Sequence, residues 1–221
     1  MDKIIIEEIK KSYCQKYNEI FIYMDPRLEA DRFNEENQTV NFCRALQEIY
    51  NDAIVWYEYP WKTEKKEDNI KGSCNRFDAV VYCPNEEFLF VIEAKCLRKK
   101  SKYEALNIDL ERICGKNDYE RKGNKVIINI PKPKKIYSVI LADYWHCKKS
   151  RSFKDIHTKW NNHIETNNDG FAIFKKHVQN WIAEPIWIIS EPKTFAKYEN
   201  YYLMAMIGEI KNAEERYTFN Q

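Results

Sequence analysis

Apolar residues recur along the chain with two periods, and these periods predict where its helices and strands lie. Apolar side chains three and four positions apart predict helices at 2–17, 34–52, 103–114, 153–164 and 171–181. Short apolar runs bounded by turn-forming residues predict strands at 54–59, 78–82, 88–95, 136–144, 185–189 and 201–207. The order of these elements predicts an α/β fold, with a mixed central β-sheet flanked by helices.

One pair of these strands, within residues 78–95, predicts a β-hairpin with a turn at Pro84-Asn85. The second strand begins as a continuous apolar run, as in a strand buried on both faces, and continues directly into Glu93 and Lys95. Because side chains alternate along a strand, Glu93 and Lys95 point to the same side. Asp78 begins the partner strand, so we expect two carboxylates and a lysine to converge at one edge of the sheet.

These three residues suit the hydrolysis of a phosphodiester with the help of a metal ion. Two carboxylates with open positions bind a hard cation such as Mg²⁺, which keeps waters for substrate and nucleophile. A lysine beside them can orient or deprotonate the attacking water, and can offset charge on the phosphate in the transition state. The plainer alternative is that Glu93 and Lys95 only mark the exposed end of a core strand.

Asp78 followed by Glu93-Ala94-Lys95 resembles the motif of the PD-(D/E)xK nuclease superfamily, whose fold is called restriction-endonuclease-like. Phe77 stands where the name of the motif has proline, and the resemblance covers about 35–145 but not the ends of the chain. It implies a restriction-endonuclease-like core and a Mg²⁺-dependent endonuclease, in which Mn²⁺ can substitute. The implied partner is nucleic acid, with DNA favoured, in restriction or phage defence. A nuclease-fold module without activity, which binds nucleic acid or protein, is the alternative.

In the family that this chain resembles, the first core helix often brings a third acid to the metal. Glu35 and Glu36 lie in the first turn of the helix predicted at 34–52, after the N-cap Asn34. The apolar stripe of this helix puts Glu36 slightly nearer the sheet. We therefore predict that Glu36 completes the site and binds the metal with Asp78 and Glu93, with Glu35 as the alternate. Acids that merely compensate the helix dipole are the other interpretation.

A basic cluster follows the strand that carries the acids, where it can contact phosphates on either side of the scissile one. A solvated surface run is the alternative interpretation. The predicted nucleic-acid-binding residues are Arg76, Arg98, Lys99, Lys100 and Lys102. On the helix that comes next, Asp109, Glu111 and Arg112 are predicted to be exterior rather than catalytic.

Composition limits the classes to which the chain can belong. Its 221 residues fit one domain, with a nuclease-like core at 34–145, an N-terminal helical addition at 1–33 and a C-terminal α/β extension at 146–221. The net charge is only +2, so any basic surface must be local. Seven scattered cysteines without a CxxC pair favour reduced thiols and argue against structural zinc.

The N-terminal segment has an apolar run too short for a signal peptide or a membrane span. We therefore expect a cytoplasmic protein with no membrane partner. The first helix is expected to cover the sheet, and a contact in a homodimer is the alternative role. With only five glycines, the chain also lacks the loops that bind nucleotides in P-loop and dinucleotide-binding proteins.

Overall fold

The computed structural model describes residues 3–23, 35–63, 76–97, 100–114, 125–147, 160, 170–190, 193–195 and 198–219. The helix predicted at 153–164 lies outside these residues, apart from Trp160. Arg98 and Lys99, from the predicted nucleic-acid-binding set, also lie outside them.

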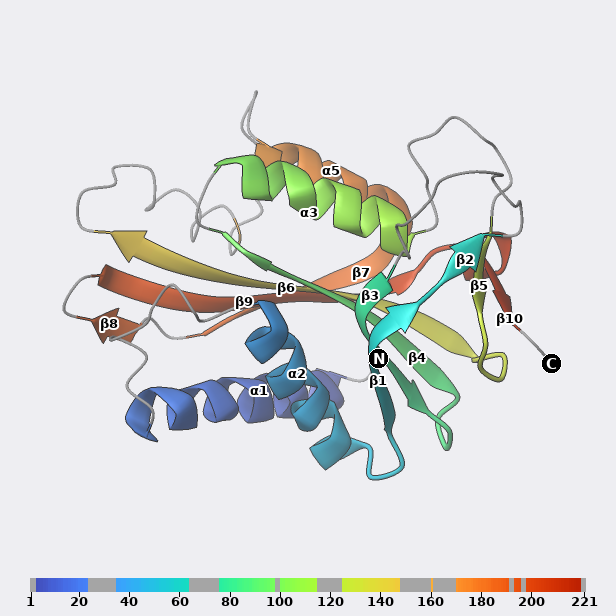
Figure 1. The fold of residues 1–221 in the computed structure, drawn as a ribbon, viewed down its shortest axis with the longest axis horizontal. Coiled ribbons are helices and arrows are strands. Elements are labelled where there is room, and N and C mark those ends of the chain that lie inside the picture. The colour runs from blue at the N-terminus through green and yellow to red at the C-terminus, as the bar shows by residue number, and fades with distance from the viewer. Residues whose placement is uncertain are drawn as a thin grey trace.

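Seven strands form one mixed sheet (Figure 1). They are β1 (Ile54–Pro60), β3 (Arg76–Cys83), β4 (Phe88–Cys96), β6 (Lys135–Cys147), β7 (Ile182–Ile189), β8 (Lys193–Phe195) and β9 (Tyr198–Ile210). Their spatial order is β1-β3-β4-β6-β9-β7, and β8 pairs with β9. Strands β4 and β6 pair in parallel, with helix α3 (Lys100–Ile113) in the connection between them. The α/β class, the mixed sheet and the hairpin, which is formed by β3 and β4, are confirmed.

Helices cover both faces of this sheet (Figure 1). Helices α1 (Lys3–Tyr23) and α2 (Glu35–Ile49) lie on one face, and α3 and α5 (Gly170–Trp181) lie on the other. Alternate side chains of β4 enter the two cores: Phe90 and Ile92 pack with α1 and α2, and Leu89 and Val91 with α3 and α5. Because both faces of β4 are covered, its sequence is apolar without interruption up to Glu93.

A second sheet of three short strands lies beside the end of α3. It contains β2 (Lys62–Thr63), β5 (Val126–Ile128) and β10 (Tyr217–Phe219), and the 3₁₀-helix η3 (Ala213–Glu215) precedes β10. The hydroxyl of Tyr217 donates a hydrogen bond to the carbonyl of Ile113, and the guanidinium of Arg216 donates one to the carbonyl of Cys114. The C-terminal strand therefore anchors the end of α3. Strands this short have no period that a sequence pattern could reveal.

Two elements differ in extent from their predictions. Helix α1 continues to Tyr23, beyond the predicted end of its apolar pattern. Strand β7 begins at Ile182, directly after α5, and its register against β9 shifts between Ala183 and Ile186. The shift includes Glu184, whose φ is 44°. In the described part of the chain, no helix combines the length and the apolarity needed to cross a lipid bilayer.

Candidate functional site

The candidate site lies where the two strands of the hairpin separate. The register between β3 and β4 ends at the pair formed by Ala79 and Ile92. Beyond this pair, β3 remains beside β1 as far as Arg76, and β4 remains beside β6 as far as Cys96. The backbone N–H groups on the freed edge of β4 therefore need partners other than a neighbouring strand.

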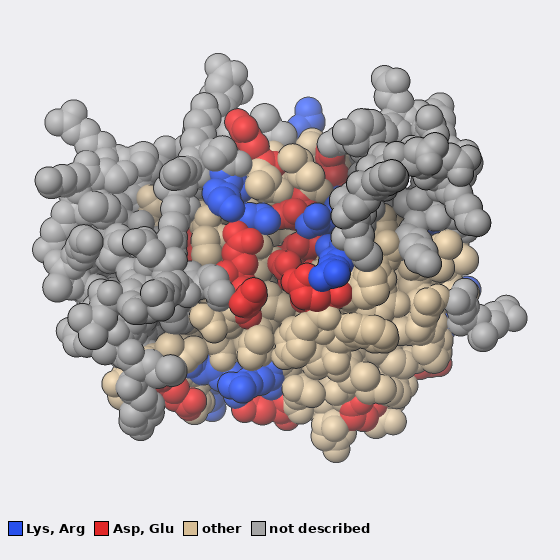
Figure 2. All heavy atoms as spheres, viewed as in Figure 1, with Lys and Arg blue, Asp and Glu red and all other residues tan. Residues whose placement is uncertain are grey.

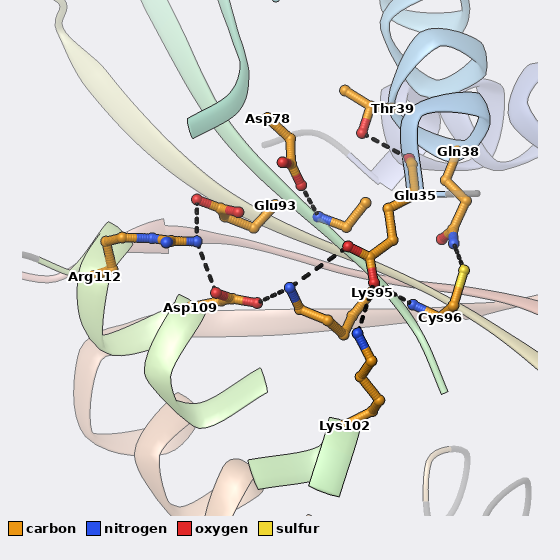
Figure 3. Close-up of polar contacts among 11 residues, drawn as sticks. Glu35, Gln38, Thr39, Asp78, Glu93, Lys95, Cys96, Lys102, Asp109 and Arg112 are labelled. Carbon is orange, nitrogen blue, oxygen red and sulfur yellow. Dashed lines mark hydrogen bonds and ion pairs between the residues drawn. The ribbon is translucent and has the colours of Figure 1, made fainter. Parts of the chain in front are cut away.

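Two carboxylates provide these partners (Figure 3). The N–H of Ala94 donates a hydrogen bond of 2.6 Å to Oδ2 of Asp78. The next N–H on the same edge, that of Cys96, donates one of 3.1 Å to Oε1 of Glu35. Hydrogen bonds to an ionised acceptor are stronger than neutral ones. The departure of β3 thus explains why acids from a strand and a helix meet at this point.

Glu35, rather than Glu36, reaches the site from α2. Its carboxylate lies 3.7 Å from the amine of Lys95 and 3.5 Å from that of Lys102, whereas Glu36 is exposed. The prediction that Glu36 lies nearer the sheet than Glu35 is therefore wrong. The first turn of the helix is rotated so that its other acid faces the end of β4.

The reason is that the buried face of α2 contains polar residues near the site. Gln38, Thr39 and Phe42 are all buried, and they follow Glu35 at the spacing of one helix face. The side-chain amide of Gln38 lies 3.5 Å from the sulfur of Cys96, so a polar contact joins the helix to β4. A pattern that counts only apolar residues as buried places the centre of this face too far from Glu35.

Helix α3 contributes two further charges to the site. Oδ2 of Asp109 lies 2.9 Å from Nζ of Lys95, and Oδ1 of Asp109 lies 2.7 Å from Nη2 of Arg112. The same Nη2 lies 2.7 Å from Oε1 of Glu93. The side chains thus form a chain of alternating charge from Glu35 through Lys95, Asp109 and Arg112 to Glu93 (Figure 3).

The prediction that the charged residues of α3 are exterior is wrong for Asp109 and Glu111, which are both buried. Arg112 is half-buried. The sequence contained a signal for Asp109, because it lies between Leu106 and Leu110 on the apolar stripe of the helix. An acid within such a stripe needs a buried partner, and here the partners are Lys95 and Arg112.

Burial, and after it the negative charge of neighbouring acids, raises the pKa of both acids of the hairpin. For Asp78 the main cause is burial, which the hydrogen bond from Ala94 and the charge of Lys95 oppose. The pKa of Glu93 is raised well above its ordinary value, first by burial and then by the negative charge of Asp78. Arg112 opposes this rise. The positive charge near Asp78 and Glu93 is therefore too small to offset their burial and their negative charge.

Lys95 is held in its charged form. Burial lowers the pKa of its amine, but the negative charges of Asp109, Glu35 and Glu93 outweigh burial and raise the pKa above its ordinary value. The amine therefore stays protonated at neutral pH. It can stabilise negative charge nearby but does not readily accept a proton.

A metal ion at these acids would take few protein ligands from the described residues. No group of three or more His, Cys, Asp or Glu side chains within the described ranges is arranged to hold a metal ion. Asp78 and Glu93 each have one oxygen beyond those that contact Ala94 and Arg112. Mg²⁺ commonly binds one or two carboxylates and keeps several waters, so this donor set suits it better than a metal that needs a closed cage.

Among the basic residues predicted to bind nucleic acid, the structure describes the side chains of Arg76 and Lys102. Arg76 is exposed and lies 3.6 Å from Glu58, and Lys102 is 45% exposed beside Glu35. Lys100 begins α3, but its side chain is outside the described set. Figure 2 shows acidic and basic side chains mixed in the middle of this face, instead of one continuous basic surface.

No family model, curated protein or solved structure matches this chain.

Proposed function

We propose that this chain is a Mg²⁺-dependent endonuclease of the PD-(D/E)xK type, with a restriction-endonuclease-like core. The observation that carries the proposal is the separation of β3 and β4, which leaves Asp78 and Glu93 together beside the charged amine of Lys95. Two carboxylates and a cationic group in this order suit metal-assisted hydrolysis of a phosphodiester.

Asp78 and Glu93 would hold the cation. This cation would be Mg²⁺, for which Mn²⁺ can substitute. When bound, the cation would polarise a phosphate oxygen and lower the pKa of a coordinated water. The chain holds one acid in position through the hydrogen bond from the Ala94 N–H to Asp78. Since a twisted strand end rather than a loop carries this acid, its geometry depends on the rigid sheet.

Lys95 is proposed to offset the charge that develops on the phosphate. The raised pKa of its amine favours this role over the removal of a proton from water. Glu35 and Asp109 lie on either side of the amine and limit its movement. The sequence alone left both roles open for this lysine.

The proposed substrate is nucleic acid, with DNA favoured and a role in restriction or phage defence. Lys102 is the described basic residue that best suits contact with a neighbouring phosphate, because it is partly exposed and close to Lys95 through their shared partner Glu35. Because the net charge is only +2, a contact with nucleic acid would have to come from a local group of basic residues.

The test is cleavage of plasmid, single-stranded DNA and RNA with Mg²⁺, with Mn²⁺ and with EDTA. We expect cleavage with either metal and none with EDTA. Asp78→Ala should remove both cleavage and the binding of Mn²⁺ measured by calorimetry. Asp52→Ala is the matched control, because Asp52 also accepts a backbone hydrogen bond, of 2.7 Å from Asn85, but lies away from the site. Cleavage that persists in Asp78→Ala or in EDTA would refute the proposal.

Lys95→Ala should lower the cleavage rate by about two to three orders of magnitude, as expected when a group that stabilises transition-state charge is removed. Its matched control is Lys135→Ala, because Lys135 forms an ion pair of 2.8 Å with Glu209 outside the site. Equal rates in the two variants would remove Lys95 from the proposed mechanism.

One contact favours the second candidate function, a nuclease-fold module without activity. Arg112 lies against Glu93 and supplies part of the positive charge that a metal would bring. The cleavage assay decides between the two candidates. If the chain does bind a metal, the contact between Arg112 and Glu93 must have a role other than replacing that metal.

A further inference from the structure

We propose that Arg112 is a resident counter-cation of Glu93, which stabilises this carboxylate in the metal-free chain and competes with a divalent cation for it. The inference rests on the proposed function, since it takes Asp78 and Glu93 as the residues that hold the metal. It adds a regulatory role for a residue of α3, a helix whose charges the catalytic motif does not include.

The contact between Arg112 and Glu93 is short, but it lacks the geometry of an aligned hydrogen bond. Nη2 lies 2.7 Å from Oε1 of Glu93, yet this oxygen receives no aligned hydrogen bond from the described residues. The contact with Asp109, also 2.7 Å, is an aligned hydrogen bond. A single nitrogen of the guanidinium thus serves both acids, in contrast to the two parallel bonds of a strong arginine–carboxylate pair.

Arg112 keeps a partner when Glu93 turns to another cation. Asp109 lies three residues before Arg112 on the same helix, so their contact does not depend on the position of β4. Arg112 is also 29% exposed, compared with 2% for Glu93. Its guanidinium can therefore gain water when the contact with Glu93 is lost, whereas Glu93 cannot.

The need for a counter-cation follows from the burial of Glu93. A buried carboxylate beside a second one is unstable as an anion unless positive charge is close to it. Arg112 is the basic residue that contacts Glu93 within the described part of the chain, while Lys95 contacts Asp109 and Glu35. A divalent cation brings more positive charge to the same acid and repels the guanidinium. Arg112 and the metal therefore compete through charge repulsion, even though Arg112 contacts only one of the two oxygens of Glu93.

The test compares Mn²⁺ binding to the wild type and to Arg112→Gln by calorimetry at pH 8. The variant is expected to bind Mn²⁺ about tenfold more tightly, because the repulsion between the guanidinium and the metal is absent. Its melting temperature should be lower than that of the wild type without metal and close to it with saturating metal. Arg44→Gln removes the same charge from an exposed position on α2, and its affinity for Mn²⁺ should not change.

A second measurement needs no variant at site residues. In the wild type, the NMR signal of the Arg112 Nε–H group should shift when Mg²⁺ saturates the site, while that of Arg216 should not. Arg216 is a suitable internal reference, because its guanidinium binds backbone carbonyls of Cys114 and Lys211.

Equal or weaker Mn²⁺ binding by Arg112→Gln, in a wild type that does bind the metal, would overturn this inference and leave the proposed function intact. An Arg112 signal that does not move at saturating Mg²⁺ would also overturn it. If neither the wild type nor Arg112→Gln binds a divalent cation, this inference and the proposed function both fail.

Discussion

Asp109→Asn should destabilise the protein, because the carboxylate of Asp109 contacts two positively charged side chains, Lys95 and Arg112, where α3 packs against β4. Its carboxylate lies 2.9 Å from the amine of Lys95 and 2.7 Å from the guanidinium of Arg112. The side chain of Asp109 is only 6% exposed, so water cannot replace it easily. The substitution retains the shape of the side chain and removes its charge.

The magnitude follows from these distances. At an effective dielectric constant of about 20, opposite charges 2.9 Å apart attract by about 6 kcal/mol, and much of this is offset by the cost of desolvating the ions. Removal of one partner from a buried ion pair typically costs about 3–5 kcal/mol. Lys95 and Arg112 keep contacts with Glu35 and Glu93 and are partly exposed, so we expect a smaller loss, about 2–4 kcal/mol.

The assay is thermal and urea unfolding of the metal-free protein. In a domain of this size, a loss of this free energy should lower the melting temperature by about 5–12 °C. The control is Glu58→Gln, which breaks an exposed ion pair with Arg76 and should change the free energy of unfolding by less than about 0.5 kcal/mol. If Asp109→Asn is no less stable than Glu58→Gln, the charges on α3 do not hold the site together.

Three further predictions concern the acids of the site. Glu93→Gln should stabilise the metal-free protein by about 0.5–2 kcal/mol at neutral pH, since it removes a buried charge that Asp78 repels; an unchanged melting temperature would count against this. Because the pKa of Glu93 is raised on folding, the folded chain binds its proton more tightly than the unfolded chain, and its carboxyl stabilises only while protonated. The advantage of Glu93→Gln over the wild type should therefore be absent near about pH 4, grow as the pH rises toward the folded pKa of Glu93 and level off above it, as urea unfolding across this range can show. Glu35→Gln should reduce cleavage about tenfold or more and Glu36→Gln by less than about twofold, because Glu35 contacts Lys95; the reverse order in a cleavage assay would contradict the placement of α2.

Much of the fold could be predicted from the sequence because the signals are local. Strand alternation and the turn at Pro84-Asn85 identify the hairpin, and it is present as β3 and β4. The same alternation places Glu93 and Lys95 on one side of β4, where both contact α3. These features depend on residues a few positions apart. A period of two or of 3.6 is enough to identify them.

The choice between Glu35 and Glu36 shows where the local signal ends. Both acids border the apolar stripe of α2, and a rotation of the helix by a fraction of a turn exchanges their positions. Buried Gln38 and Thr39 set this rotation, because the helix packs a polar patch against the end of β4. Polar residues that are buried by a partner have the same sequence pattern as polar residues in water.

The sequence by itself determined the α/β elements, the hairpin and the three charged residues Asp78, Glu93 and Lys95, because their spacing is a property of one strand pair. Only the tertiary structure decided that β3 pairs with β4 no earlier than Ala79, so that carboxylates take the place of a neighbouring strand beside the end of β4. It also decided that Asp109 and Arg112 complete the charge chain. Periodicity tells which side of a helix is buried, whereas the identity of the opposing element depends on how the chain folds back on itself.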